Sequence, residues 1–298
     1  MSLTTLPLEM PNQISSKRAL LNSHRAGKFL FCAGLALAAS STSHAALIAH
    51  WDLDSAGESL SATAGTLSGD AAVGASAIAP SGNGALTTTT GTFDSNMVAD
   101  DITGFGGSGS FTILSWFQTS SATDQTIFNY SPSEGSNGGA DLRFFVNSTG
   151  DFRVEMSSGA GFDLGLGSVN LNDGATHMVG VIFDSSTGDS FHDLDLYIDG
   201  TLYSVTGGTD HTVNLSGSAE SGTTEGTIIF GMNQPNNSNV EKQFIGTIDD
   251  IAIYDQALDT TALASIAANG VVIPEPSAFA LLLASGVGTL VCLRRRKA

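Results

Sequence analysis

The stretch Asp193–Val205, DLDLYIDGTLYSV, decides the fold class. Its first half alternates between two faces, with Leu194, Leu196 and Ile198 on one and Asp193, Asp195 and Tyr197 on the other. Such alternation is typical of an antiparallel strand with one face in the core and one toward solvent. Asp199-Gly200 then separates two alternating runs, and Gly supplies the positive φ that a two-residue hairpin turn requires. The stretch therefore predicts a β-hairpin.

Segments of the same kind recur between residues 46 and 257, separated by Gly, Ser, Asn and Asp. The candidate strands are Leu47–Leu53, Ser110–Gln118, Thr126–Tyr130, Asp141–Val146, Asp151–Met156, His177–Phe183, Asp193–Asp199, Thr201–Val205, Thr227–Gly231 and Phe244–Tyr254. One short helix is expected over Thr260–Ala268, capped by Asp259 and ended by Asn269-Gly270. No strand–helix–strand rhythm is present, which excludes parallel-sheet folds. About a dozen strands in one body predict an all-β fold, a large jelly-roll β-sandwich of two antiparallel sheets.

The charge is strongly negative and unevenly distributed. The chain has 11 Lys and Arg against 29 Asp and Glu in 298 residues, a net charge of −18. Between Ala46 and Ile273 there are 27 acidic residues and only three basic ones, Arg143, Arg153 and Lys242. Such a body repels phosphate backbones and anionic lipid surfaces, and it attracts divalent cations. Nucleic-acid binding is therefore excluded.

Residues 1–45 have the features of a signal peptide. A basic stretch ends at Lys28, an apolar run covers Phe29–Ala39, and Ser43–Ala45 places small residues before a cut at Ala46. The apolar run is too short to span a bilayer comfortably, so an uncleaved N-terminal anchor is the less favoured alternative. We expect the chain to be exported.

The C-terminal end has three parts in order. Pro274-Glu275-Pro276 comes first, the uncharged run Ser277–Leu293 follows, and Arg294–Lys297 is a basic cluster. The uncharged run is just long enough to cross a thin bilayer as a helix, with the basic cluster on the cytoplasmic side. The pattern resembles the PEP-CTERM sorting signal of Gram-negative bacteria. That resemblance implies transient anchoring in the inner membrane, processing by an exosortase, and delivery to the cell surface or extracellular matrix. A plain tail anchor is the alternative.

The two cysteines agree with this organisation. Cys32 and Cys292 each lie in one of the apolar end segments. Once residues 1–45 and 271–298 are removed, the remaining domain, 46–270, has no disulfide, no thiolate nucleophile and no thiolate metal site. Its stability must come from its core, and a bound ion could add to it.

Four stretches of the body occur in the order of a known family. They are Leu47–Asp54 (LIAHWDLD), Gly109–Phe117 (GSFTILSWF), His177–Asp184 with Leu196–Gly200 (HMVGVIFD and LYIDG), and Phe244–Tyr254 (FIGTIDDIAIY) with Gln256-Ala257-Leu258. These motifs resemble the laminin-G-like group of the concanavalin A-like lectin/glucanase superfamily. The resemblance implies the jelly-roll fold, but lectins, adhesion modules, hydrolases and lyases all share that fold.

Hydrolases of this superfamily carry Glu-x-Asp-x-(x)-Glu on one strand, which places two carboxyls about 5 Å apart. No Glu of the body has Asp two residues further on, and Glu155, beside Arg153 on a predicted strand, is a lone carboxylate. Neither a Gly-x-Ser-x-Gly elbow nor a His-Glu-x-x-His motif is present. The histidines are widely spaced, and we expect His177 to be structural. The sequence therefore predicts no catalytic residue, and a polysaccharide-cleaving enzyme is the least favoured hypothesis.

A structural calcium site is the best chemical hypothesis. Members of the superfamily often hold Ca²⁺ between the opening strand and the Asp that begins the closing strand. In this chain the closing residue is Asp249, and its partner comes from the neighbourhood of Asp52, through main-chain carbonyls or the carboxylate. The alternative is that these acids are solvated or satisfied by backbone N–H groups.

Aromatic side chains do not identify a ligand. Trp51 and Trp116 lie on family core strands and are expected to pack, while Tyr130 and Tyr203 are possible sugar platforms but more often half-buried strand residues. The favoured interpretation is an exported surface or matrix protein that binds or adheres to extracellular polysaccharide or to another surface protein. A structural surface protein without a small ligand is the alternative.

Overall fold

The structure is a computed structural model. It describes residues 45–55, 65–74, 77–80, 82–89, 96–99, 102, 105–131, 142–156, 160–163, 169–205, 210–215, 227–232 and 242–272. Residues 1–44 and 273–298 lie outside these ranges, and with them the predicted signal peptide, the Pro274–Pro276 motif, the membrane helix and the basic tail. Within the ranges given, no helix has both the length and the apolar character needed to cross a membrane.

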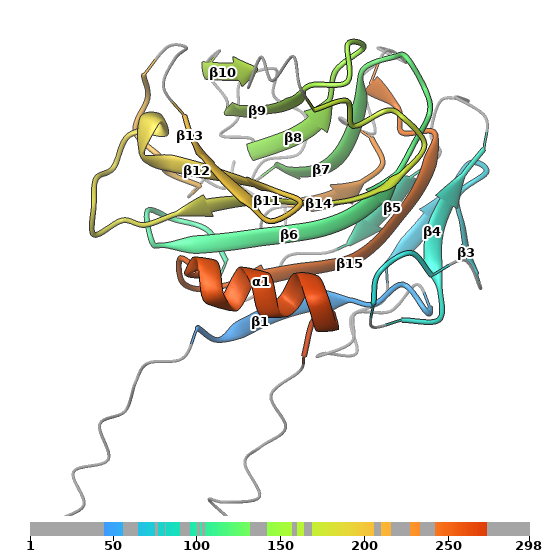
Figure 1. Ribbon diagram of the computed structural model, residues 1–298, viewed down its shortest axis with the longest axis horizontal. Coiled ribbons are helices and arrows are strands. Elements are labelled where there is room, and N and C mark those ends of the chain that lie inside the picture. Colours follow the sequence, from blue (N-terminus) through green and yellow to red (C-terminus); the bar gives the residue numbers. More distant parts are fainter. Residues whose placement is uncertain are drawn as a thin grey trace, which may run out of the picture. The chain divides into compact units, whose positions relative to one another are not determined.

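Two antiparallel sheets make up the described body (Figure 1). The first has eight strands: β1 (Leu47–Trp51), β3 (Ala72–Gly74), β4 (Ala85–Thr88), β6 (Phe111–Gln118), β11 (Thr176–Phe183), β12 (Leu194–Ile198), β13 (Thr201–Ser204) and β15 (Gly246–Tyr254). Their order is β13-β12-β11-β6-β15-β4-β3, and β1 pairs with β15 off this path. A 3-10 turn, η1 (Phe191–Asp193), leads into β12.

The second sheet has seven strands: β2 (Thr66–Ser68), β5 (Asn96–Ala99), β7 (Gln125–Ser131), β8 (Leu142–Val146), β9 (Phe152–Met156), β10 (Ala160–Asp163) and β14 (Thr227–Phe230). Their order is β10-β9-β8-β7-β14-β5-β2. The chain passes repeatedly between the sheets, so strands that are neighbours in space are often distant in sequence. The predicted jelly-roll sandwich is confirmed.

The main core lies between the sheets and is rich in aromatic side chains. Phe128 stacks on Phe144 with ring centroids 5.2 Å apart, and Trp51 meets Phe230 edge-on at 5.0 Å. Aromatic pairs of this kind add to the hydrophobic gain from their burial. Trp51 and Trp116 are both buried, so both pack as predicted.

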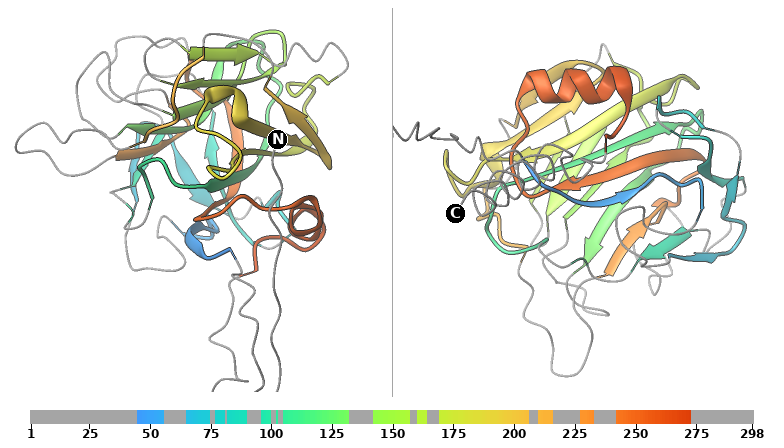
Figure 2. Two further views of the ribbon diagram at one scale, coloured as in Figure 1. Left: turned by 90° about the vertical axis from the view of Figure 1, so that its left-hand side faces the viewer. Right: turned by 90° about the horizontal axis from the view of Figure 1, so that it is seen from below.

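The one α-helix within the described residues, α1 (Thr260–Asn269), covers part of the outer face of the eight-stranded sheet (Figures 1 and 2). Its buried Leu263 joins a second apolar cluster that includes Trp116 and Tyr254 of the sheet. Asp259 is the N-cap, accepting a hydrogen bond from the Ala262 N–H at 2.8 Å. The outer face of the eight-stranded sheet is thus partly sealed by apolar packing.

The first and last strands of the body are neighbours. Leu47 pairs with Tyr254 and Trp51 with Ile251 in the β1–β15 ladder. The opening and closing motifs therefore belong to one sandwich, which brings the acids near Asp52 and Asp249 to one place.

Candidate functional site

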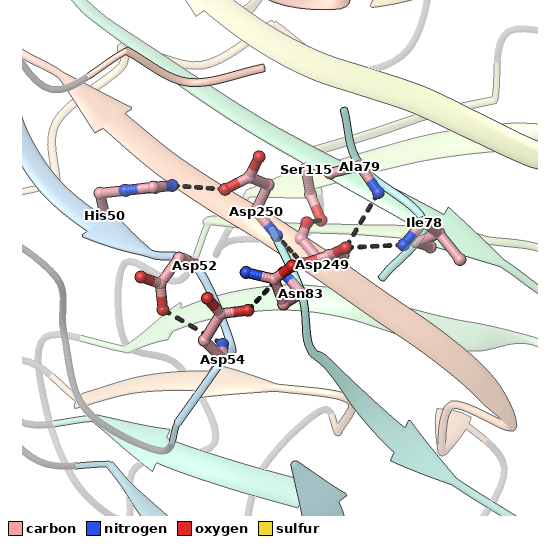
Figure 3. Close-up of polar contacts among 9 residues, drawn as sticks. All are labelled: His50, Asp52, Asp54, Ile78, Ala79, Asn83, Ser115, Asp249 and Asp250. Atoms are coloured by element: carbon pink, nitrogen blue, oxygen red, sulfur yellow. Dashed lines mark hydrogen bonds and ion pairs between the residues drawn. The ribbon is translucent and has the colours of Figure 1, made fainter. Parts of the chain in front are cut away.

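Two successive acids are buried at an irregularity in β15. The pairing of β15 with β6 shifts register between Asp249 and Ala252, and Asp250 has a φ of 46°. Such a bulge re-aims side chains, and here it leaves both Asp249 and Asp250 fully buried. Figure 3 shows the two carboxylates pointing to different partners.

Asp249 is held by three backbone donors. Its Oδ2 accepts hydrogen bonds from the N–H groups of Ile78 and Ala79, both at 2.9 Å, and its Oδ1 accepts from the N–H of Asp250 at 2.8 Å. Burial nevertheless outweighs these bonds and raises the pKa of Asp249 to about 6. An additional positive charge nearby would stabilise the ionised form of the Asp249 carboxylate.

Asp250 faces the opening strand. Its Oδ1 lies 2.5 Å from Nε2 of His50, and both side chains are buried. Because His50 belongs to β1, this contact joins the two ends of the sandwich through side chains as well as through the β1–β15 ladder. The sequence motifs gave no sign of this pair.

Oxygens of the opening segment approach Asp249 around Gly82. A Cβ placed on Gly82 would lie 3.5 Å from the main-chain carbonyl oxygen of Asp52, 3.7 Å from Oδ1 of Asp54 and 3.8 Å from Oδ1 of Asp249. The carboxylate of Asp52 itself accepts a hydrogen bond from the Asp54 N–H at 3.2 Å, and Oδ1 of Asp54 accepts from the Asn83 N–H at 2.6 Å. Figure 3 shows Asp52, Asp54 and Asn83, with these two hydrogen bonds, beside Asp249.

This arrangement fits a hard cation in donor type, with one carbonyl and two carboxylate oxygens contributed by two segments, the opening one and β15. In this group of oxygens Asp52 has its main-chain carbonyl and Asp54 its carboxylate, and the sequence motifs did not point to Asp54. Among the described residues there is no cluster of three or more His, Cys, Asp and Glu side chains placed to hold a metal. The candidate therefore depends on main-chain oxygen as well as on carboxylates.

A second group of charged residues lies on the outer face of the seven-stranded sheet. Leu142, Phe144 and Val146 of β8 point into the core, so the intervening Arg143 and Phe145 lie on the opposite face. In β9, Arg153 and Glu155 lie on that same face. The register places Arg143 opposite Glu155 and Phe145 opposite Arg153.

Glu155 is the common partner of three cations. Nε of Arg143 donates to Oε2 at 2.5 Å, Nε of Arg153 donates to Oε1 at 2.7 Å, and Nζ of Lys242 lies 3.7 Å from Oε2. Although burial works to raise it, the charges of Arg143 and Lys242 hold the pKa of Glu155 below its usual value. We call Arg143, Arg153 and Lys242 the basic cluster.

The basic cluster rests on an aromatic ring. Phe145 is buried, with Nζ of Lys242 4.5 Å and Cζ of Arg153 5.7 Å from its ring centroid. Cations over a ring face are attracted by its quadrupole, which helps to fix both side chains. The cations remain reachable from solvent, since their side chains are 20–32% exposed.

The remaining predicted residues have structural positions. His177 lies between two acids, with Nδ1 2.6 Å from Oδ2 of Asp199 and Nε2 3.2 Å from Oδ1 of Asp173. Tyr130 is buried in the main core and Tyr203 is packed against it. Tyr130 therefore presents no open ring face for stacking on a sugar, and Tyr203 is half-buried.

Several solved structures are similar to this chain at low sequence identity. Domain 4 of AbnA, an extracellular GH43 arabinanase from Geobacillus stearothermophilus solved with arabinotriose, is 18% identical with a TM-score of 0.53, covering 75% of this chain and 98% of its own. The binding domain of botulinum neurotoxin serotype G is 13% identical with a TM-score of 0.49, covering 74% of this chain and 50% of its own. The CBM40 of a Ruminococcus gnavus IT-sialidase, solved with α2,3-sialyllactose, is 14% identical with a TM-score of 0.43, covering 54% and 84%.

No curated protein matches the chain. A laminin-G family model, described as the concanavalin A-like lectin/glucanases superfamily, matches residues 89–264, more than half of the sequence. This range contains both partners of every contact in the basic cluster and the closing acids Asp249 and Asp250. The chain belongs to the concanavalin A-like lectin/glucanases superfamily.

Proposed function

We propose that this protein binds extracellular polysaccharide through the outer face of its seven-stranded sheet. The observation that carries the proposal is the reachable set of charged side chains on β8 and β9, centred on Glu155, while α1 covers part of the other sheet's outer face. Hydrogen-bonding groups fixed on a rigid sheet are suited to orienting a ligand. A domain of the same fold solved with arabinotriose lends further support.

The surroundings of Glu155 are better suited to binding a polysaccharide than to cleaving one. Glycosidases need one carboxyl that stays protonated to act as an acid, and a second one as nucleophile or base. Glu155 is paired with arginines on two strands, and its lowered pKa keeps it ionised near neutrality. We propose that Glu155 positions the arginines and is not a catalytic acid.

Export and surface delivery belong to the same proposal. The features of residues 1–45 and the ordered Pro274–Pro276, apolar and basic parts of residues 271–298 support cleavage of a signal peptide and sorting by an exosortase. A protein delivered in this way meets the polysaccharides of the cell surface or matrix. The domain that does the binding would be residues 46–270.

Calcium has a structural role in this proposal. Asp249, Asp54 and the carbonyl of Asp52 would hold the ion between the opening and closing segments. The ion would supply the positive charge that the buried carboxylate of Asp249 lacks. The basic cluster would bind the polysaccharide independently of it.

The test is a binding screen with the purified protein against immobilised neutral and acidic polysaccharides, with release of reducing ends measured in parallel. We expect binding to at least one polysaccharide and no new reducing ends. Absence of binding to the whole panel would leave the structural surface protein as the better account. Release of reducing ends would establish the enzyme instead.

A further inference from the structure

A groove between α1 and the end of β15 lies where both ends of the described body leave the sandwich. Its volume is about 390 Å³, within the range of ligand pockets. Ala45 and Val272, the first and last residues that the structure describes, both line it. The other walls are mostly apolar and include Tyr254, Leu258, Ala262 and Ile266. We call this hollow the end groove, and the chain that continues from either end of the body is within its reach.

The C-terminal end of the body passes directly along the end groove. Val271 is buried in the second apolar cluster, whereas Val272 lines the groove and is 67% exposed. Leaving apolar walls and an exposed valine in contact with water costs free energy. An apolar segment that covered them would therefore be stabilised.

Of the two segments that continue from the body, only the C-terminal one offers apolar side chains. Before Ala45 comes the polar stretch Ser41–His44, and the proposed cleavage of the signal peptide would remove it. After Val272 come Ile273 and Pro274. Successive Cα atoms are about 3.8 Å apart, so Ile273 can reach the groove straight from Val272.

Ile273 and Pro274 lose little conformational freedom when they dock. The ring of a proline fixes its own φ, and the residue before a proline is restricted to extended conformations. Pro274 also has no N–H, so covering its backbone nitrogen leaves no donor without a partner. The hydrophobic gain from burying Ile273 is therefore opposed by a smaller entropy cost than for most pairs of residues.

Negative charge limits how much of the tail can dock. Asp259 lines the end groove, and Asp255 lies at the start of the loop that leads to it. The three basic residues between positions 46 and 273 all contact Glu155 on the other sheet. Glu275 would meet like charges without a cation to offset them, so docking should end at Pro274 and leave Glu275 in solvent.

We propose that the end groove binds Ile273 and Pro274 of this same chain, the two residues with which the tail begins. The groove then holds the base of the tail against the body, and Glu275 and the apolar run beyond it leave from a fixed point. Docking of this kind requires neither polysaccharide nor calcium, so its test is independent of theirs.

The test measures how fast a single thiol in the end groove reacts with a maleimide. Ser265 lines the groove and is exposed, so Ser265→Cys places the thiol there, in the full-length protein purified in detergent with Cys32→Ser and Cys292→Ser. We expect the docked segment to protect this thiol. Adding Ile273→Asp, which replaces an apolar contact with a charge, should raise the reaction rate about tenfold or more.

Two results would overturn the proposal. Equally fast reaction with and without Ile273→Asp would mean that the end groove is open to solvent. Equally slow reaction in both proteins would mean that something else occupies it. Protection that disappears on dilution would then identify a second copy of the chain, and protection that persists would identify a bound molecule.

Matched controls separate the apolar contact from charge and from changes in α1. Ala264→Cys is exposed on α1 next to Ser265 but outside the residues that line the groove, and it should react equally fast with and without Ile273→Asp. Ser277→Asp adds the same charge four residues further along the tail and should leave Ser265→Cys protected, as should Ile273→Val. Loss of protection with Ser277→Asp would also contradict the proposal, because charge on the tail and not the contact of Ile273 would then control access.

Discussion

At the scale of single residues, Asp249 illustrates how a carboxylate can be kept in a β-sandwich core. Three backbone N–H donors satisfy it, and yet burial still raises its pKa to about 6. The negative charge of the buried carboxylate is not neutralised, because hydrogen bonds from neutral N–H groups offset it only in part. That is the physical reason to expect a cation beside Asp54 and the Asp52 carbonyl.

We predict that Ca²⁺ raises the melting temperature at pH 7 and that Asp249→Ala abolishes the difference. At free Ca²⁺ about a hundredfold above its dissociation constant, binding adds roughly 2.7 kcal/mol, which for a domain of about 200 residues corresponds to several degrees. The measurement is a pair of melting curves in Ca²⁺ and in chelator. Asp54→Ala should reduce the difference, whereas Asp195→Ala, on β12 of the same sheet, should not. Identical curves for the unmodified protein would rule out the calcium site.

His177 is a second residue whose titration can be predicted. Its hydrogen bond to Asp199, and the further one to Asp173, raise the pKa of His177 above 6.5 despite partial burial. The protonated form is therefore favoured in the folded state. Its stabilisation is fully present below pH 6.5 and is lost as pH rises through the folded pKa.

The corresponding variant is Asp173→Asn, which keeps an oxygen to accept from the Ala175 N–H but removes one charge beside His177. We expect the NMR titration midpoint of His177 to fall toward 6.5. The control is Asp195→Asn, whose carboxylate accepts from the Ser204 hydroxyl and has no contact with His177, and it should leave the His177 midpoint unchanged. An unchanged His177 midpoint would show that Asp173 does not interact with it in solution.

At the scale of elements, α1 depends on its first turn. Asp259 caps it, Leu263 anchors it to the sheet, and Gly270 ends it with a φ of 79°. We predict that Asp259→Ala lowers the free energy of unfolding by about 0.5–2 kcal/mol, because the Ala262 N–H loses its acceptor. Urea unfolding measures the change. Thr261→Ala, exposed in the same turn, should alter it by much less, and an equal loss would contradict the capping role.

All strands of five or more residues could be predicted from the sequence, whereas of the seven strands of three or four residues only β13 and β14 could. All ten predicted strands occur with ends shifted by one or two residues, and the Asp199-Gly200 turn has the expected positive φ at both positions. The five strands that were missed, β2, β3, β4, β5 and β10, have three or four residues. A segment that short shows too little alternation to be distinguished from a loop, and pairing with neighbours defines it.

The candidate sites were predictable to different degrees. Asp249 and the Asp52 region followed from motifs, because the family places both next to the paired end strands. The donors at Ile78 and Ala79 did not, since they come from a segment about 170 residues away in the chain. The basic cluster depends on the β8–β9 register and on Lys242 returning to the same face, and neither is visible in a linear pattern.

At the scale of the whole molecule, the two ends of the body are tied to each other. The Ala46 N–H donates to Oδ1 of Asp255 at 2.8 Å, and the Ala46 carbonyl accepts from the Asp255 N–H at 3.1 Å. Together with the β1–β15 ladder, these bonds close the sandwich where the predicted signal peptide and sorting signal would leave it. Removal of both end segments would therefore leave the paired strands in place.

Cleavage before Ala46 would convert its amide nitrogen into an ammonium group beside Asp255. We predict that the mature protein from its native host begins at Ala46 and lacks Arg294–Lys297, as intact-mass measurement would show.

The new charge on the Ala46 nitrogen strengthens its bond to Asp255 at neutral pH, because an α-amino group titrates near 8. Asp255→Asn should consequently destabilise the mature form by up to about 1 kcal/mol more than the uncleaved form. That extra loss should vanish at pH 10, where the amine is neutral, since an amine whose pKa is raised by a carboxylate stabilises the fold only while protonated. Equal effects on both forms at pH 7 would show that the amine and Asp255 do not pair, and a mature chain that keeps Arg294–Lys297 would exclude exosortase processing.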